Sequence, residues 1–195
     1  MKKILISVIL AFCATTLFAQ SGKPEKTVMK PALLVIDVQK QFLPMMSKED
    51  QDKALMMMNW SIWVFRQYGF PVIRVYHTSD KWGPKPDDPG FQFADTLKIL
   101  DTDPKIVKTY GSAFNKTGLD KLLKEKGINT LYLCGLSSVG CVLATYTDAA
   151  NYDYKAFLIK DALMGPDAVQ TDQIETILGA VGLETIDYMF EIRAE

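Results

Sequence analysis

The sequence predicts an α/β fold in which a parallel sheet is wrapped by helices. Short apolar runs rich in β-branched and aromatic residues alternate with segments whose apolar residues recur at helical spacing. Two of these runs, 32–36 and 130–134, are almost unbroken, as is typical of central strands buried on both faces. With 195 residues, of which 48% are hydrophobic, the chain can fill the core of one domain.

Six segments are expected to form the strands of this sheet. They are residues 32–36, 72–76, 105–107, 130–134, 156–159 and 185–186. Three prolines between residues 82 and 90 predict a loop rather than a regular element.

Capping residues and apolar stripes mark the helices. One helix is expected to begin after Ser47, because Asp50 follows three residues later and apolar residues recur at positions 55, 58, 62 and 65. A second helix is expected between Thr117 and Gly127. Asp167 is expected to cap the last helix, whose apolar residues lie at positions 174, 177, 178 and 181.

The first of these helices carries a second apolar face, made by Met56, Trp60 and Trp63. Two interpretations of this face stay open. It is either a subunit interface, where aromatic and methionine side chains are favoured, or a helix that is buried widely under loops.

The first residues are expected to form a cleavable signal peptide. Lys2 and Lys3 precede an apolar run over 4–19, which is shorter than the roughly 20 residues needed to span a bilayer. We therefore predict a signal peptide over 1–19 with cleavage after Ala19, a short linker over 20–30, and a domain over 31–195. The mature protein is expected to be periplasmic or secreted, without a stable membrane anchor. The alternatives are an uncleaved anchor or a lipid anchor through Cys13.

The charge balance and the single histidine narrow the range of functions. The chain has 22 Lys+Arg and 23 Asp+Glu without a basic run, which argues against nucleic acid as a partner. Serine hydrolases of the α/β-hydrolase order and papain-type cysteine hydrolases place a histidine after the nucleophile, and no histidine follows His77. Dinucleotide and P-loop motifs do not occur, so no cofactor is expected. His77 with Asp80 offers too few ligands for a metal site, so no metal is expected.

Cys141 is the candidate nucleophile. It lies where the turn after the fourth predicted strand enters a predicted helix over 142–150. A thiol at a helix N-terminus is expected to have a lowered pKa, and ligands of open α/β sheets bind at this end of the strands. The plain alternative is a buried structural cysteine, which suits Cys134, inside the strand.

Two further polar residues occupy corresponding positions. Asp37 ends the first strand and Lys108 ends the third. Alone, the aspartate could simply cap a helix and the lysine could simply be solvated. Together with Cys141 they place a carboxylate, a cation and a thiol at one edge of the sheet, as nucleophilic catalysis requires.

Around these residues the chain resembles the isochorismatase-like cysteine hydrolase superfamily, which includes nicotinamidases and other small-amide hydrolases. The resemblance extends over about residues 31–186. The segments that carry it are 32–39 with Phe42, 89–90, 108–114, 133–142, 148–149 and 160–162.

The resemblance implies a Rossmann-like three-layer α/β/α sandwich with a six-stranded, mainly parallel sheet, a homo-oligomer and a small-molecule substrate. It implies Asp37 as base, Lys108 as electrostatic partner and Cys141 as nucleophile. It also implies a cis peptide bond between Leu136 and Ser137, with the backbone N–H groups of Ser137 and Cys141 as the oxyanion hole. The candidates for lining the substrate pocket are Phe42, His77, Trp82 and Tyr110.

The chain departs from the family pattern just before the nucleophile. Where the family has Thr followed by Asn or Asp, Ser138 keeps the hydroxyl and Val139 loses the polar group. The metal-binding histidines of nicotinamidases are not visible around 77–82. The leading hypothesis is a cysteine hydrolase that cleaves a small-molecule amide or related bond through a thioester. The alternatives are a binding protein with lapsed activity, hinted at by Val139, and a redox protein with a Cys134–Cys141 disulfide.

Overall fold

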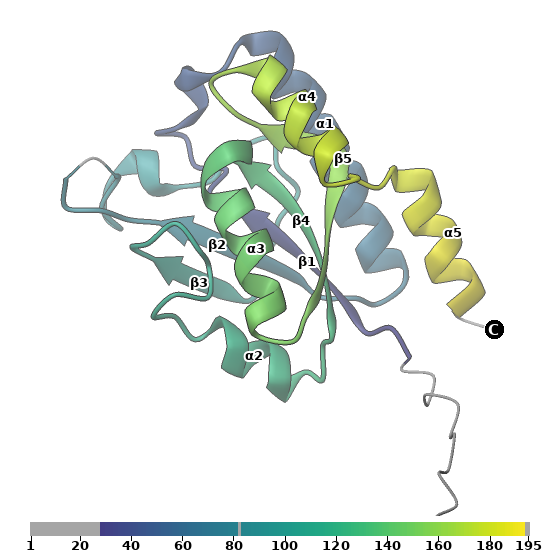
Figure 1. The fold of residues 1–195 in the computed structure, drawn as a ribbon. Helices are drawn as coiled ribbons and strands as arrows, with labels where there is room; N and C mark the ends of the chain where they lie inside the picture. The colour runs from purple at the N-terminus through teal and green to yellow at the C-terminus, as the bar shows by residue number, and fades with distance from the viewer. Residues whose placement is uncertain (1–27, 82, 194–195) are drawn as a thin grey trace, which may run out of the picture.

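A five-stranded parallel sheet forms the centre of the molecule, in the order β3-β2-β1-β4-β5 (Figure 1). The computed structural model describes residues 28–81 and 83–193. The predicted signal peptide, most of the linker and Trp82 therefore lie outside the described residues and stay predictions. The strands are β1 (Pro31–Ile36), β2 (Val72–His77), β3 (Lys105–Lys108), β4 (Thr130–Leu136) and β5 (Lys155–Met164).

The two unbroken apolar runs form the central strands β1 and β4, as predicted. Every residue of both strands is buried, and the two strands pair directly, with Leu34 opposite Leu133. Such runs suit a position covered by helices on both faces of a parallel sheet.

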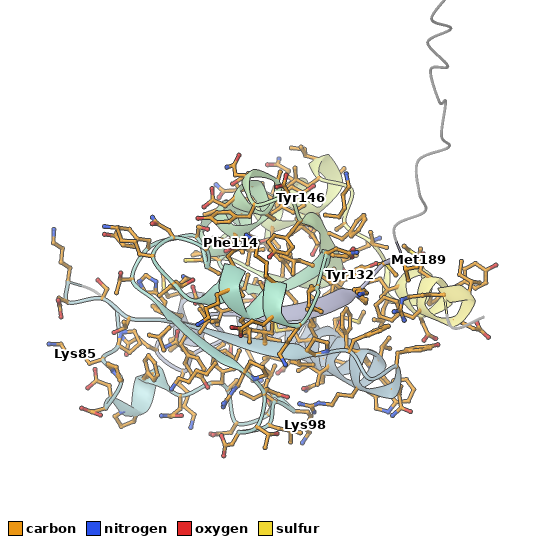
Figure 2. The ribbon with its side chains drawn as sticks, turned by 90° about the horizontal axis from the view of Figure 1, so that it is seen from below. Lys85, Lys98, Phe114, Tyr132, Tyr146 and Met189 are labelled. Atoms are coloured by element: carbon orange, nitrogen blue, oxygen red, sulfur yellow. The ribbon has the colours of Figure 1, made fainter. Side chains whose placement is uncertain are left out.

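Helices cover both faces of the sheet, so the predicted three-layer α/β/α architecture is confirmed (Figures 1 and 2). Side chains of β1 alternate between the layers: Leu33 and Val35 pack with α1 and α5, while Leu34 and Ile36 pack with α2 and α3. Tyr146 marks the α3 side of the sheet in Figure 2. The helices are α1 (Lys48–Gln67), α2 (Leu119–Glu125), α3 (Leu143–Asn151), α4 (Ala168–Ile177) and α5 (Leu183–Arg193).

The predicted caps of α1 and α4 are confirmed. The Ser47 hydroxyl accepts a hydrogen bond from the Asp50 amide at 3.1 Å, and the Asp167 carboxylate accepts one from the Gln170 amide at 3.1 Å. Each cap satisfies a backbone donor that the first helical turn leaves without a partner. The apolar stripe of α1 at positions 55, 58, 62 and 65 is buried.

The predicted sixth strand over 185–186 is wrong, because these residues lie in α5. Ile186 and Phe190 are one helical turn apart and fully buried, and the Phe190 ring packs edge-on against Phe65 and Tyr132 at 5.0 and 5.7 Å between ring centroids. A stretch of two residues carries no period that separates a strand from a helix. The helix capped by Asp167 is also shorter than expected, since it ends at Ile177 and is followed by Gly179 at φ 62°.

The second apolar face of α1 is open to solvent in this chain. Met56, Trp60 and Trp63 are 54%, 53% and 52% exposed, so the interpretation that loops cover them is wrong. The subunit interface stays a prediction. Over residues 28–193, position 82 aside, the structure contains no helix with the length and apolar character needed to cross a membrane.

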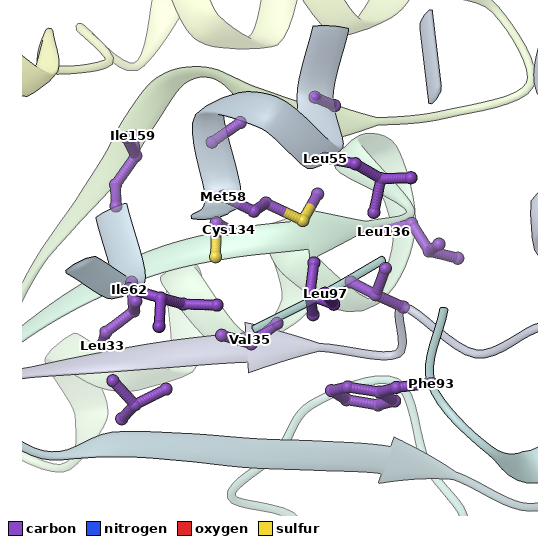
Figure 3. Close-up of a cluster of buried hydrophobic side chains, with 14 of the residues drawn as sticks. Leu33, Val35, Leu55, Met58, Ile62, Phe93, Leu97, Cys134, Leu136 and Ile159 are labelled. Atoms are coloured by element: carbon purple, nitrogen blue, oxygen red, sulfur yellow. The ribbon is translucent and has the colours of Figure 1, made fainter. Parts of the chain in front are cut away.

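Cys134 belongs to the core, as the structural interpretation expects. Figure 3 shows it in the cluster that α1 makes with the sheet, close to Met58. It is fully buried, and burial raises the pKa of its thiol. Cys134 and Cys141 are both free thiols in the structure.

We expect the docking of α5 to depend on Phe190. The Phe190→Ala substitution should lower the free energy of unfolding by about 3–5 kcal/mol, because it removes a fully buried ring and leaves a cavity. Tyr188→Ala on the same helix is the matched control, since Tyr188 is 62% exposed, and its effect should stay within about 0.5 kcal/mol. Urea denaturation measures both values. Equal losses in the two variants would contradict this account of the packing.

Candidate active site

The strand order reverses between β1 and β4, at whose carboxyl ends the candidate residues lie. The chain runs outward from β1 through β2 to β3 and then returns to the other side of β1 as β4. In open α/β sheets, ligands bind where the strand order reverses in this way. Asp37 follows β1 directly, and Cys141 lies in the π-helical turn Ser138–Val142 that follows β4. His77 and Lys108 are the last residues of β2 and β3 and lie opposite each other in register.

Asp37 and Lys108 form a buried ion pair. Nζ of Lys108 lies 2.6 Å from Oδ2 of Asp37, and the two side chains are 0% and 2% exposed. The backbone of Asp37 turns into the left-handed region at φ 54°, which aspartate tolerates better than most residues. Its amide donates to the Val75 carbonyl at 2.8 Å, which ties the end of β1 to β2.

The Lys108 ammonium group also contacts His77 and Tyr110. Nζ lies 3.2 Å from Nδ1 of His77 and 3.2 Å from the backbone oxygen of Tyr110. An ammonium group has three donors, and Asp37, His77 and Tyr110 account for one each. These contacts hold the Lys108 ammonium group in place.

Cys141 completes the cluster. Its Sγ, a carboxylate oxygen of Asp37 and a ring nitrogen of His77 lie within 4.8 Å of one another. The structure therefore brings together Asp37, Lys108 and Cys141, the three side chains that the sequence predicts at one edge of the sheet. Thiol, imidazole and carboxylate are also metal ligands, and two of the three groups, the Asp37 carboxylate and the His77 ring, contact the Lys108 ammonium group in the structure.

Burial dominates the electrostatics of the site. It raises the pKa of Asp37 to about 6, against the opposing effect of the Lys108 charge. Burial, together with the charge of Asp37, raises the pKa of Cys141 to about 11. The expectation that the helix end lowers this pKa is therefore wrong, because Cys141 precedes α3 and packs against the core beside a carboxylate. At neutral pH the resting site holds a thiol next to an ionised Asp37.

The turn that carries Cys141 is held from two sides. The peptide bond between Leu136 and Ser137 is cis. The Ser138 hydroxyl lies 2.8 Å from that of Thr171, which itself donates to the Asp167 carbonyl at 3.1 Å, so Ser138 donates to Thr171. On the other side, the Thr145 hydroxyl donates to the Cys141 carbonyl at 2.7 Å.

Thr145 also joins the turn to the loop that follows Lys108. Its hydroxyl accepts a hydrogen bond from the Ala113 amide at 3.0 Å, and the side chain is fully buried. Thr145 is not among the residues predicted for the site from the sequence. Its position one helical turn after Cys141 was the available signal, since a threonine hydroxyl reaches the carbonyl four residues back.

Gln39 is a second residue that the sequence analysis missed. Its side chain accepts from the His77 amide at 2.7 Å and donates to the His77 and Phe91 carbonyls, both at 3.0 Å. The side chain is fully buried, so it fixes the backbone of His77 from both sides. A polar residue three positions after a buried strand was the signal in the sequence.

The candidates for the substrate pocket lie in different surroundings. Phe42 is buried and presents its ring edge-on to His77 at 6.1 Å between ring centroids. Tyr110 is 43% exposed, and its hydroxyl accepts from Nζ of Lys116 at 3.1 Å. Trp82 lies outside the described residues. Contact of these side chains with a substrate stays a prediction, as does the oxyanion hole at the amides of Ser137 and Cys141.

The chain resembles known proteins over most of its length. The model of the Isochorismatase domain family matches residues 31–182. The uncharacterized isochorismatase family protein YrdC of Bacillus subtilis is 34% identical over 136 residues, which cover 68% of this chain and 73% of YrdC. YddQ, described in the same words and from the same organism, is 30% identical over 167 residues, or 83% of this chain and 89% of YddQ. The crystal structure of N-carbamoylsarcosine amidase from Thermoplasma acidophilum superposes with a TM-score of 0.68 at 29% identity, covering 79% of this chain and 95% of that one.

We expect the Thr145 hydroxyl to stabilise the junction between the two loops. The nearly isosteric Thr145→Val substitution leaves the buried Ala113 amide without an acceptor and should lower the free energy of unfolding by about 1–3 kcal/mol. Thr147→Val is the control, because Thr147 makes the same kind of bond to the Leu143 carbonyl on the exposed side of α3. Its effect should stay within about 0.5 kcal/mol by thermal or urea denaturation. A Thr145 variant as stable as the Thr147 variant would refute the role given to this bridge.

Proposed function

Because this chain belongs to the isochorismatase family, we propose that it is a cysteine hydrolase that cleaves an amide or related C–N bond of a small molecule. The observation that carries the proposal is the convergence of Cys141, Asp37 and Lys108 at the reversal point of the sheet. The likeness to an amidase of known structure at 29% identity supports this reaction class. The substrate itself is left open.

Asp37 has the position and the pKa of a general base for the thiol. Lys108 occupies Oδ2, whereas Oδ1 is buried and accepts no hydrogen bond from the described residues. In the proposed mechanism this oxygen accepts the proton of Cys141, and the interaction with that thiol lowers the pKa of Asp37. A carboxylate with a pKa of about 6 is ionised at neutral pH and basic enough to take part in proton transfer.

The reaction then follows in two halves. As Asp37 takes the thiol proton, Sγ attacks the carbonyl carbon, and the amides of Ser137 and Cys141 hold the resulting oxyanion. Asp37 returns the proton to the leaving nitrogen, the C–N bond breaks, and an amine leaves a thioester on Cys141. Water, deprotonated by Asp37, attacks the thioester, and the acid product departs as the thiol is restored.

The nucleophile is tested by comparing the two thiols of the described chain. Cys141→Ala should abolish turnover of every small amide that the wild type hydrolyses, because the thioester cannot form without the sulfur. Cys134→Ala is the control, since Cys134 lies in the core and should affect stability more than kcat. Mass spectrometry of the enzyme quenched during turnover should show an acyl adduct on Cys141. Undiminished hydrolysis by the Cys141 variant would remove it from the mechanism.

The pH dependence of the reaction should report the ionisation of Asp37. The base acts only when it is ionised, so kcat/KM should rise with pH through about 6 and fall tenfold per unit below it. Stopped assays across this range measure the acid limb. Asp37→Asn should lose most of the activity, and the remaining activity should no longer fall with pH near 6. If kcat/KM of the wild type instead falls near the ordinary aspartate value of about 4, Asp37 is not the base.

A further inference from the structure

We infer that His77 is a positioning residue whose neutral imidazole accepts a hydrogen bond from Lys108 and thereby holds the ammonium group against Asp37. The inference rests on the proposed function, because it gives His77 the role of positioning Lys108 beside the general base Asp37 and not the role of contacting the substrate. It follows from the contacts of Lys108, from the chemistry of an ammonium donor and from the way the structure holds the imidazole ring.

The contacts of Lys108 give His77 its place. The ammonium group is fully buried and has one acceptor for each of its three N–H groups: Oδ2 of Asp37, Nδ1 of His77 and the carbonyl of Tyr110. A buried donor that loses its acceptor carries an uncompensated desolvation cost. Without His77, Lys108 would either bear that cost or turn toward another acceptor and away from Asp37.

The direction of the Lys108–His77 bond follows from the donor. An ammonium group has no lone pair, so Nδ1 must be the acceptor and the proton of a neutral ring must be on Nε2. The titratable groups around the ring come from three elements: Asp37 after β1, Lys108 of β3 and Cys141 in the turn after β4. Burial and the charge of Lys108 lower the pKa of His77 to about 4, so the ring is neutral at the pH where Asp37 acts.

Several of the described residues hold His77 in place. Its backbone is held on both sides by Gln39, and Lys108 lies directly opposite in the β2–β3 register. Phe42 packs edge-on at 6.1 Å, and a Cβ atom added to Gly83 would come within 3.2 Å of Cδ2 of the ring. An acceptor held this firmly keeps Lys108 on Oδ2 of Asp37, which leaves Oδ1 for the thiol.

The tautomer can be measured directly, because His77 is the one histidine of the chain. Tag-free protein labelled with ¹⁵N-histidine should give a single set of ring signals, with the proton on Nε2 and none on Nδ1. The ring should stay neutral, with no proton on Nδ1, from about pH 8 down to about pH 5.5, well above the pH at which it gains a proton. A proton on Nδ1, or titration near the ordinary value of about 6.5, would overturn the inference. This measurement needs no substrate.

Two variants separate positioning from substrate contact. His77→Leu removes the acceptor and should lower kcat about 10- to 100-fold with KM little changed. The fall of kcat/KM toward low pH should begin at a higher pH than in the wild type. The displaced ammonium group no longer opposes the effect of burial, so the pKa of Asp37 rises. His77→Asn, whose amide oxygen can replace Nδ1, should restore most of kcat and the wild-type limb.

A different pattern of kinetic changes would indicate that His77 contacts the substrate. A raised KM with an unmoved acid limb in both variants would overturn the positioning role. Failure of the wild type to hydrolyse any amide would count against the proposed hydrolase. In that case the ¹⁵N spectra of the wild type and of Lys108→Met would still decide the question. The substitution should release His77, so its pKa should rise toward the ordinary value; an unchanged spectrum would refute the Lys108–His77 bond.

Discussion

The buried ion pair between Asp37 and Lys108 constrains the whole candidate active site. Each ion costs several kcal/mol to remove from water, so the two charges are tolerated only in direct contact and with their remaining hydrogen bonds satisfied. They come from β1 and β3, which are separated by β2 and hence by roughly 10 Å of sheet. The long stem of Lys108 supplies most of the reach across β2, and the Asp37 carboxylate meets its ammonium group at 2.6 Å. His77 ends the strand between them, which explains why its ring meets the ammonium group.

The pair also explains why Cys141 rests as a thiol. A thiolate at Cys141 would add a second negative charge beside Asp37 in a buried site, with only one cation to balance both. Burial and the Asp37 charge accordingly raise the pKa of Cys141 to about 11. In the proposed mechanism the proton moves from sulfur to Asp37 as the C–S bond forms, so the negative charge passes to the substrate oxygen. The net charge of the site stays constant throughout.

The sequence was sufficient for the layers of the fold and for the convergence of the three polar side chains. Parallel strands end at one edge, so Asp37, Lys108 and Cys141 could be placed together from strand ends alone. The links between these residues were out of reach, because Gln39 bonds to a residue 38 positions away and Thr145 to one 32 positions away. The pKa of Cys141 was mispredicted for a related reason: a helix end is visible in a sequence, whereas burial results from packing.

The turn before Cys141 bears on whether the proposed hydrolase activity is compatible with Val139. Val139 lacks the polar group that the family pattern places there, which first suggested lapsed activity. In the structure Val139 is 41% exposed, and the turn is held by Ser138 through Thr171 and by Thr145 through the Cys141 carbonyl. Those bonds keep the sulfur within reach of Asp37 without any help from position 139. The loss of a polar group at an exposed position therefore gives no physical reason for the loss of catalysis, and any effect of Val139 should fall on what enters the site.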